Sequence, residues 1–442
     1  MALSGLDIYK LLPKTNCREC GFATCLAFAM QLAKKAVSID KCPYLSEEAR
    51  KVLEASSQPP IKLVSFGSQT SPMVMGNETV LFRHEEKFHH PCGVGFIIED
   101  QMNDAQIREV LHRISQLKFE RVGQELTVNV LALRQTGSEK RFLEVLDLVS
   151  AHTSLALVLM CRDAGTLNKA LNICAAQKPL VYGANKDNLS QWGALAKEFK
   201  VPLVVSGSDL EALAGLTKEL NAQGLNELVL ETPGKGIAEN LWNLTQIRRL
   251  ALKSSQRSLG YPALAVVDRQ DPYEEAQEAA TYICKYAGLI LMKNIETWEV
   301  LALLTLRQNI FTDPQKPLQI EPKLNPVGKV TPESPVLITT NFSLSYYTVL
   351  GEAEASKIPV YIMSIDTEGM SVLTAWAAEK FTPEKITDSL AKFGVKDAVS
   401  HRTLIIHGYV AVMSGDLSEQ SGWQVVVGPK EAASIPSFLK NL

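Results

Sequence analysis

Short hydrophobic runs and longer amphipathic stretches alternate through the middle of the chain, from residue 93 to residue 311. Each run is followed by a segment whose apolar positions recur every three or four residues, for example DAQIREVLHRISQLKF, as in a helix with one buried face. The runs lack polar alternation, which is typical of parallel strands covered by helices on both sides. The predicted strands are residues 95–100, 126–133, 155–160, 180–184, 202–207, 227–232, 263–268 and 289–293.

This repeat predicts a closed barrel. Eight strands, each followed by a helix, within about 220 residues have the proportions of a (β/α)8 TIM barrel. A doubly wound open sheet remains the alternative. Polar residues at the carboxyl ends of the strands are expected to form local ion pairs, and a small-molecule site, such as one for a pterin, is the other interpretation. These residues are Glu99, Asp100, Arg134, Cys161, Arg162, Asn185, Ser206, Glu231, Asp268 and Arg269.

A second α/β pattern occupies residues 336–442. The strand-like segments VLITTNF, PVYIMSID, RTLIIHG and WQVVVGP alternate with helix-like segments, and Thr382-Pro383 has the form of a helix start. We expect a compact Rossmann- or flavodoxin-like domain with a mostly parallel sheet. Such sheets bind ligands at the carboxyl ends of their strands, where this sequence is rich in small and hydroxyl-bearing residues.

Proline-rich and polar segments separate these patterns. Residues 54–60, EASSQPP, read as a hinge, and residues 312–335 hold six prolines, which predicts an extended connector on the surface. Residues 61–82 alternate in hydrophobicity and predict a small β-hairpin with its turn at Gly76-Asn77. The expected organisation is an N-terminal domain (1–57), a linker with the hairpin (58–92), the barrel (93–311), a second linker (312–335) and the C-terminal domain (336–442).

Composition narrows the class of protein. A formal net charge of −3 argues against nucleic-acid binding, which normally requires a basic surplus. No apolar run reaches the length needed to cross a membrane, and the N-terminal residues do not resemble a secretory signal. We therefore expect a cytoplasmic protein. In that compartment clustered cysteines more often bind metal or take part in redox chemistry than form disulfides.

Four of the eight cysteines lie close together near the N-terminus. Their spacing is Cys17-x2-Cys20-x4-Cys25-x16-Cys42, and no second closely spaced pair follows, as a zinc ribbon or finger would require. Three neighbouring thiolates with a fourth from farther along the chain suit an iron–sulfur cluster, whose irons prefer soft sulfur ligands. The sequence therefore predicts a [4Fe-4S] cluster held by these four residues, with a structural zinc site as the alternative.

The run KTNCRECGFATCLAFA…KCPYL is similar to the small cluster-binding domain of corrinoid iron–sulfur proteins. The whole domain order, together with VLITTNFSLSYY, SIDTEGMSVLTAWAAEKF and GPKEAASIPSF in the last domain, resembles the large (gamma) subunit of that family, which serves the acetyl-CoA (Wood–Ljungdahl) pathway. The resemblance implies a second cofactor, a cobamide, held by the C-terminal domain. It also implies that the barrel supplies no catalytic group.

The resemblance places the cobamide against loops at the strand ends of the last domain. No Asp-x-His-x-x-Gly motif is present, so the family pattern implies base-off cobalt without a histidine ligand, which makes the Co(I) state easier to reach. Thr374 is then the candidate nearest the lower face of the corrin. The residues implied to bind the cobamide are Thr340, Ser345, Tyr346, Gly369, Met370, Ser371, Val372, Leu373, Thr374, Ala433 and Pro436.

The function implied is that of a methyl carrier, the corrinoid-dependent component of a methyltransferase system. Co(I) would accept a methyl group from methyltetrahydrofolate on a separate methyltransferase and pass it to the nickel–iron cluster of carbon monoxide dehydrogenase/acetyl-CoA synthase. The [4Fe-4S] cluster would return Co(II) to Co(I), and a small subunit would complete a heterodimer. Two alternatives remain: an iron–sulfur electron carrier without a cobamide, and a pterin-dependent methyltransferase barrel with an accessory cluster.

Overall fold

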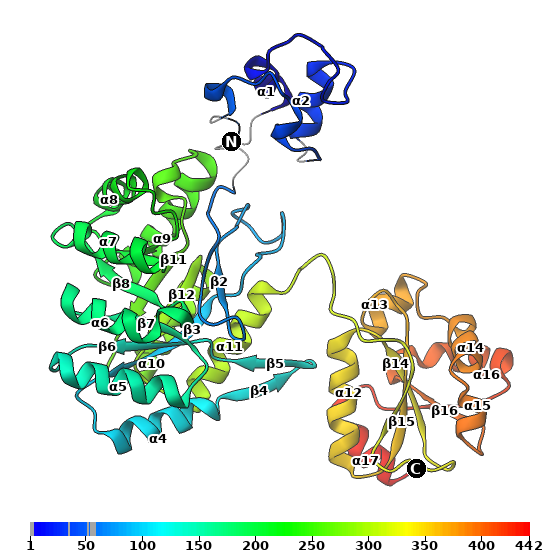
Figure 1. Cartoon of the computed structure of the whole chain (residues 1–442). Helices are drawn as coiled ribbons and strands as arrows, with labels where there is room; N and C mark the ends of the chain where they lie inside the picture. Colours follow the sequence, from blue (N-terminus) through cyan, green and yellow to red (C-terminus); the bar gives the residue numbers. More distant parts are fainter. Residues whose placement is uncertain (1–3, 34–35, 51–52, 54–58) are drawn as a thin grey trace. The chain divides into compact units, whose positions relative to one another are not determined.

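The computed structural model describes residues 4–33, 36–50, 53 and 59–442, so most of the expected hinge at 54–60 lies outside the described residues. The chain divides into two compact units, and each is described by itself (Figure 1). The first comprises residues 1–119 and 126–311, and the second comprises residues 120–125 and 312–442. No described helix is both long and apolar enough to cross a membrane.

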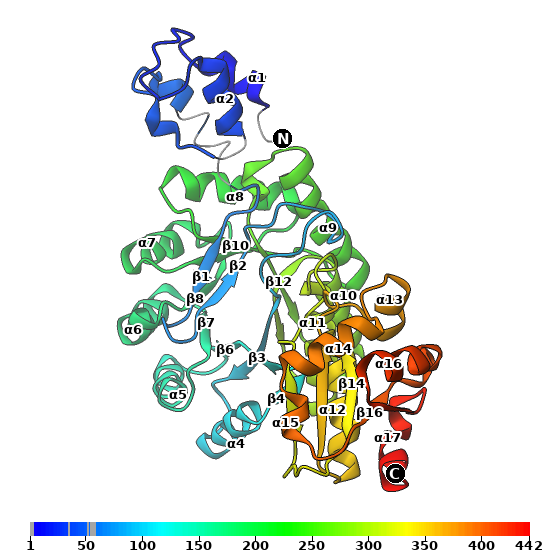
Figure 2. The same cartoon turned by 90° about the vertical axis from the view of Figure 1, so that its right-hand side faces the viewer.

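The first unit contains a closed barrel of eight parallel strands, which confirms the barrel and excludes the open sheet (Figure 2). Strands adjacent in sequence are adjacent in space, and β12 pairs with β3 to close the ring. The strands are β3 (Gly93–Glu99), β6 (Val130–Arg134), β7 (Ala156–Met160), β8 (Leu180–Ala184), β9 (Leu203–Val205), β10 (Leu228–Glu231), β11 (Ala263–Val267) and β12 (Ala287–Met292).

A helix follows every barrel strand. Several begin at a side chain that accepts a hydrogen bond from the first turn, as Asn103, Ser138, Asp163 and Asp209 do. The helices are α4 (Asp104–Ser115), α5 (Glu139–His152), α6 (Ala164–Cys174), α7 (Leu189–Phe199), α8 (Leu210–Ala222), α9 (Ile237–Lys253), α10 (Pro272–Cys284) and α11 (Thr297–Phe311), with short 3-10 turns η2 (Ala175–Gln177) and η3 (Arg257–Leu259).

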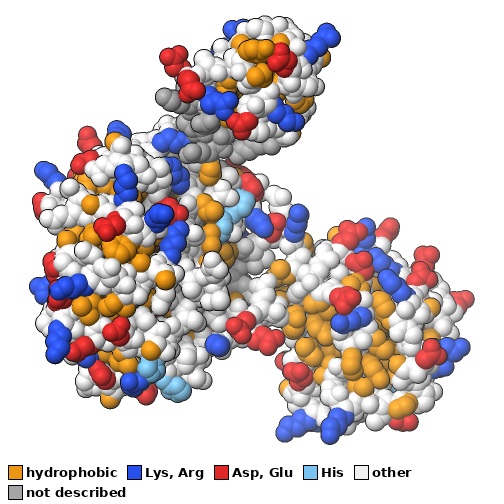
Figure 3. All heavy atoms as spheres, viewed as in Figure 1, with side chains coloured by type: hydrophobic (Ala, Val, Ile, Leu, Met, Phe, Trp, Pro, Cys, Tyr) orange, Lys and Arg blue, Asp and Glu red, His pale blue; other side chains and the backbone are white. Residues whose placement is uncertain are grey.

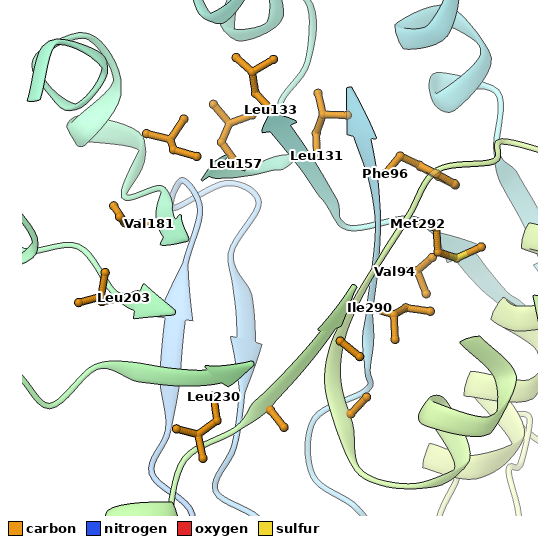
Figure 4. Packing of buried hydrophobic residues seen from close by; sticks show 14 of the residues in the cluster. Val94, Phe96, Leu131, Leu133, Leu157, Val181, Leu203, Leu230, Ile290 and Met292 are labelled. Carbon is orange, nitrogen blue, oxygen red and sulfur yellow. The ribbon is translucent and has the colours of Figure 1, made fainter. Parts of the chain in front are cut away.

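The two faces of each barrel strand pack into different cores, which explains why the runs are apolar throughout. In β6, for example, Leu131 and Leu133 pack outward in the large core shared with the helices (Figure 4). Val130 and Ala132 belong to a separate cluster that fills the barrel interior. Since successive side chains of a strand point to opposite faces, both sets must be apolar when both faces are buried.

A hairpin closes the barrel at the amino ends of its strands. Its strands are β1 (Val64–Phe66) and β2 (Met73–Met75), and their buried side chains join the interior cluster. Met73 lies against Gly93 at the start of β3, and Met75 lies near Gly288 at the start of β12. The hairpin was predicted, but its turn is formed by residues 67–72, because the predicted turn at Gly76-Asn77 follows β2.

One predicted barrel strand, 126–133, is two separate strands. Its first part belongs to β5 (Gln124–Thr127), which pairs with β4 (Lys118–Arg121) in a small hairpin of its own. Asn129 lies between β5 and β6, and its side-chain oxygen accepts a hydrogen bond from Arg307 at 2.5 Å. Asn129 is a single polar residue flanked by Val128 and Val130, so hydrophobicity alone did not reveal this junction.

The second unit contains a five-stranded sheet in the order β13-β15-β14-β16-β17. Four strands are parallel, and their order is that of flavodoxin-like sheets, which reverses between β14 and β16. The strands are β13 (Leu324–Val327), β14 (Val336–Thr340), β15 (Val360–Ile365), β16 (Thr403–Ile406) and β17 (Gln424–Val427).

The proline-rich segment 312–335 is therefore more than a connector. It contributes β13, which pairs antiparallel with β15 at the edge of the sheet. Pro326 lies within this strand, and an edge strand tolerates proline because one side of it makes no ladder hydrogen bonds. Because prolines are uncommon in strands, this strand was not predicted from the sequence.

Helices cover both faces of this sheet. The side chains of α12 and α17 pack on one face, and those of α13 to α16 pack on the other. Residues 408–421, which follow β16, form η4 and α16. The elements are α12 (Ser343–Ser356), α13 (Val372–Ala377), α14 (Pro383–Lys392), α15 (Val395–Ala398), η4 (Gly408–Met413), α16 (Ser414–Ser421), η5 (Ala432–Ser434) and α17 (Ile435–Lys440).

Candidate functional site

The cysteine motif folds into a small helical unit of its own. Its elements are α1 (Gly5–Leu11), α2 (Cys25–Ala33) and η1 (Ile39–Lys41), which precedes the fourth cysteine. Thr24 caps α2, because its hydroxyl accepts a hydrogen bond from the amide of Ala27 at 3.1 Å. Cys25 and Cys42 are buried in a cluster with Ile8, Phe28 and their neighbours, whereas Cys20 is half-buried and Cys17 is exposed.

The loop before α2 adopts an unusual backbone conformation. Lys14, Asn16 and Arg18 all have positive φ, at 58°, 51° and 67°, followed by Gly21 at 84°. Positive φ is uncommon outside glycine and persists only where the surroundings impose it. Asn16 supplies part of this constraint, since its side-chain oxygen accepts the amide of Cys25 at 2.8 Å. Asn16 thus ties this loop to the start of α2.

The Cys42 thiol lies within electrostatic range of the other three motif sulfurs. Burial raises the pKa of the Cys42 thiol, and the sulfurs of Cys20, Cys25 and Cys17 raise that pKa further. Tyr44 closes the site, because its hydroxyl donates to Glu19 at 2.8 Å and so joins the loop of the first cysteines to that of the last. Among the described residues, no three His, Cys, Asp or Glu side chains are grouped as a site for a single metal ion.

A cavity of about 370 Å³ opens in the C-terminal unit, where β14 and β16 separate. Its walls come from the ends of these strands, from α12, from the start of α13 and from the segment after β17. Most of its lining is apolar, and hydrophobic side chains also gather on the surface of this unit (Figure 3). The large exposed apolar residues on its rim are Leu344, Leu373 and Tyr409.

This position is the one where doubly wound sheets bind ligands. Helices leaving adjacent strands pass to opposite faces of the sheet at the point where the strand order reverses, which leaves a crevice at the carboxyl ends. The volume is also within the range of small-molecule sites. The cavity is therefore the candidate binding site of the C-terminal unit.

Asn341 organises one wall of this site. It follows β14, is 1% exposed, and its side-chain oxygen accepts hydrogen bonds from the amides of Thr367 and Gly369 at 2.9 and 3.1 Å and from the Thr367 hydroxyl at 3.1 Å. Its side-chain nitrogen donates to Gln319 at 3.1 Å. Asn341 thereby fixes the turn that leads into Ser371 and α13.

A polar group lies at the end of β16, on the opposite wall. Burial lowers the pKa of His407, so its imidazole is neutral at pH 7. Its Nδ1 accepts the amide of Tyr409 at 3.2 Å, which leaves the proton on Nε2. The Tyr409 ring stacks on the imidazole at 5.4 Å, and its hydroxyl donates to Glu431 at 2.8 Å. His407 is thus a fixed hydrogen-bond donor at the cavity.

The structure brings some of the predicted cobamide-binding residues to this cavity and not others. Ser345, Ser371, Val372 and Leu373 line it. Thr374 is exposed and lies 3.0 Å from Ser371, hydroxyl to hydroxyl. The predicted residues that do not line the cavity are Thr340, Tyr346, Gly369, Met370, Thr374, Ala433 and Pro436. Ala433 and Pro436 are sequence neighbours of the lining residues Ala432 and Ile435.

Sequence reasoning missed Thr339, Asn341 and His407. The run VLITTNF shows two threonines, and alternation along β14 places Thr339 on the same face as Leu337, toward the cavity, whereas Thr340 lies on the other face. The register of the strand was the missing information. The rule that ligands bind at the carboxyl ends of strands pointed to Asn341 and His407, but it did not say which side chain would be used.

Several polar residues at the barrel mouth pair with one another, although Oδ2 of Asp100 is buried without a partner among the described residues. Arg134 pairs with Asp268 at 2.8 Å and with Glu99 at 3.4 Å, as the ion-pair interpretation predicted. Glu231 accepts hydrogen bonds from both Tyr182 and Ser206. Asp100 is fully buried and accepts the amides of Thr136 and Gly137. Open hollows of about 690 and 220 Å³ occur beside Ser206 and Arg134.

Glu299 of α11 differs from these, because both of its carboxyl oxygens are buried without a partner among the described residues. Burial, with Glu275 and Glu296 nearby, raises the pKa of Glu299 to about 8. Glu275, also buried, is held by the amides of Lys293 and Asn294 at 3.0 and 2.8 Å. The Glu299 side chain is therefore protonated in the folded protein at neutral pH.

We expect Glu299→Gln to raise the free energy of unfolding at pH 8 by about 2–4 kcal/mol and to leave it nearly unchanged at pH 5. Between the unfolded pKa near 4.5 and the folded pKa near 8, only the unfolded chain releases this proton, so the stability of the natural protein falls as pH rises. Denaturant unfolding at both pH values measures the difference. The exposed Glu198→Gln is the control, and an equal effect of Glu299→Gln at both pH values would contradict the assignment.

Comparison with known proteins identifies relatives along the whole chain. The family model described as CO dehydrogenase/acetyl-CoA synthase delta subunit matches residues 63–439, and a model of an Fe-S cluster family matches residues 12–44. The corrinoid/iron-sulfur protein large subunit of Moorella thermoacetica is 44% identical over 441 residues, which cover 100% of this chain and 99% of that protein.

Archaeal proteins match over a similar length. The acetyl-CoA decarbonylase/synthase complex subunit gamma of Methanothermobacter thermautotrophicus is 36% identical, with 100% of this chain and 99% of that protein covered. Among solved structures, dihydropteroate synthase from Thermus thermophilus covers 50% of this chain and 95% of its own, with 16% identity and a TM-score of 0.37, a likeness too low to bear on function.

Proposed function

Because this chain belongs to the CO dehydrogenase/acetyl-CoA synthase delta subunit family, with corrinoid/iron-sulfur protein large subunits among its relatives, we propose that it is a methyl carrier. It would hold a cobamide in the cavity between β14 and β16 and a [4Fe-4S] cluster on Cys17, Cys20, Cys25 and Cys42. The observation that carries the proposal is the ligand-sized cavity at the switch point of the C-terminal sheet.

The residues around the cavity fit a cobamide. The apolar walls suit the flat base of its nucleotide tail, and the rim residues Leu344, Leu373 and Tyr409 offer apolar surface to the wider corrin ring. Ser371 and Thr374 are neutral hydroxyl residues at the start of α13, and the two histidines of this unit are otherwise engaged. His407 accepts the Tyr409 amide, and His401 contacts the Ser334 carbonyl at 3.0 Å. This supports binding with the base displaced and without a histidine ligand to cobalt.

The cysteine unit fits a four-iron cluster. Cys17 and Cys20 lie in a loop with three non-glycine residues at positive φ, and Asn16 and Tyr44 tie that loop to the start of α2 and to the segment after Cys42. Iron–sulfur clusters are held by such thiolates. Residues 1–57 would thus be the electron-carrying part of the chain, and residues 336–442, completed by β13, the methyl-carrying part.

The bound groups supply the chemistry: cobalt as Co(I) accepts a methyl group and gives it up, and the cluster supplies the electron that restores Co(I) from Co(II). The chain's residues bind and orient these groups and shield the cavity from water. The ion pair and hydrogen bond that Arg134 and Glu231 make within the barrel mouth support a barrel without a catalytic role. The partners proposed are a small corrinoid-binding subunit, the methyltransferase that uses methyltetrahydrofolate, and carbon monoxide dehydrogenase/acetyl-CoA synthase, all in the cytoplasm.

Metal analysis tests this proposal. The full chain, copurified without oxygen together with its small subunit, should contain cobalt and iron in a ratio of about one to four, and its absorbance should show the bands of a base-off corrinoid. Iron without cobalt would contradict the proposal and favour an electron carrier. Zinc in place of iron would contradict the cluster assignment.

A further inference from the structure

The cavity contains one unsatisfied polar group. The hydroxyl of Thr339 lines the cavity, its side chain is on a residue only 2% exposed, and it has no hydrogen-bond partner among the described residues. Of the buried polar atoms without a partner in the described part of the chain, it is the one on a cavity-lining residue. Buried hydroxyls are nearly always hydrogen-bonded, because an unpaired one forfeits the bonds it made with water.

The surroundings of Thr339 limit what could satisfy it. Leu337 on the same strand, Val349 of α12, Ile405 of β16 and Ile435 of α17 present only carbon atoms to the cavity. The group that enters must therefore be largely apolar and must carry an acceptor for the Thr339 hydroxyl. A flat aromatic base with one ring nitrogen has this chemistry, because its faces pack on aliphatic side chains and its nitrogen lone pair accepts a hydrogen bond.

We propose that Thr339 donates a hydrogen bond to the ring nitrogen of the cobamide's lower base, and that it thereby stabilises the base-off state. This inference rests on the proposed function. When the base leaves cobalt, its nitrogen loses a bond, and burial of that nitrogen without a donor would oppose the displacement. Thr339 also becomes a determinant of specificity, since it favours bases with a free ring nitrogen, such as benzimidazole, over phenolic bases that lack one.

His407 is the other fixed donor at the cavity, because its Nε2 carries the proton. It lies at the end of β16 beside Tyr409 and Glu431, so its surroundings are polar. A polar setting suits the sugar-phosphate part of the tail better than the base. Thr339 lies on the same face of β14 as the aliphatic Leu337 and is buried, unlike the exposed rim residues Tyr409 and Glu431, and we assign the base to this donor.

Paired substitutions test the proposal on the full chain with its small subunit, prepared free of corrinoid. Thr339→Val keeps the shape and removes the hydroxyl, whereas Thr339→Ser restores it. For a benzimidazole cobamide, we expect Thr339→Val to weaken binding roughly 5- to 100-fold and to shift the absorbance toward the base-on form, with Thr339→Ser near the natural protein. For a phenolic cobamide, and for cobinamide, which has no base, Thr339→Val should change nothing.

The outcomes separate this inference from the proposed function. If the natural protein binds no cobamide, the proposed function fails. If it binds and Thr339→Val loses affinity equally for all three corrinoids, or retains full affinity and base-off absorbance for the benzimidazole form, the role of Thr339 is overturned. Unfolding of the corrinoid-free variant provides the check on folding, and we expect no loss of stability, because Thr339→Val removes an unpaired buried hydroxyl.

Discussion

The variant Cys20→Ala is expected to carry out a single methyl transfer and then fail to recover whenever its cobalt is oxidised. Cys20 is a half-buried cysteine of the motif, and its loss would leave the proposed cluster with three protein ligands. The cavity proposed for the cobamide is lined by residues between 337 and 435, so removing this sulfur alters none of its walls. Methyl transfer from preformed Co(I) should therefore be unchanged, whereas reduction of Co(II) by a protein electron donor should fall to background.

Stopped-flow absorbance can follow both reactions in one preparation. Cys284→Ala is the matched control, because Cys284 is a partly exposed cysteine of α10 outside the motif, and it should retain full iron and full recovery. A strong chemical reductant that reaches cobalt directly should restore Cys20→Ala. If Cys20→Ala lost methyl transfer from preformed Co(I), the cluster would have a role in the transfer itself and the repair role would be wrong.

The barrel could be predicted from the sequence because burial on both faces leaves a plain pattern. Each strand is a mainly apolar run, and several helices have a capped start, as Asp163 and Asp209 show. The β4–β5 hairpin was not predicted, because its second strand is separated from the next apolar run by only two residues. The strand β13 was not predicted, because a proline such as Pro326 is expected in a strand only at the edge of a sheet. The edge position of this strand is known only from the tertiary structure.

The two parts of the candidate site differed in how far the sequence could define them. Cysteine spacing is local, so the four thiols could be named together from the sequence, and their role as cluster ligands stays a prediction. The cavity depends on strand register and on loops that meet from distant segments. Thr340 was predicted from the sequence as a binding residue, but the neighbouring residue Thr339 is the one that lines the cavity. Asn341 acts through hydrogen bonds to residues 26 and 28 positions away, and composition does not indicate such contacts.

Asn341→Leu should have the second large effect, the loss of cobamide binding with destabilisation of the C-terminal unit. Leucine has a similar size but accepts no hydrogen bonds, so the amides of Thr367 and Gly369 lose their acceptor. Each buried donor left without a partner costs about 1–3 kcal/mol, so we expect the free energy of unfolding to fall by about 2–6 kcal/mol. The turn that these bonds hold carries Ser371 and Val372 into the cavity wall, and its release should lower cobamide affinity roughly 100-fold.

Asn325→Leu distinguishes the loss of this turn from general destabilisation. Asn325 is also a buried asparagine of the C-terminal unit, but it lies on β13, and its side chain donates to the Ile362 carbonyl at 3.3 Å and to Ser364 at 3.4 Å. It does not line the cavity. Asn325→Leu should therefore lower stability in denaturant unfolding while retaining cobamide in an absorbance titration. If both variants lost cobamide in proportion to their loss of stability, Asn341 would matter only for folding. If Asn341→Leu bound cobamide normally, the turn at 367–371 would not form the wall of the cobamide site.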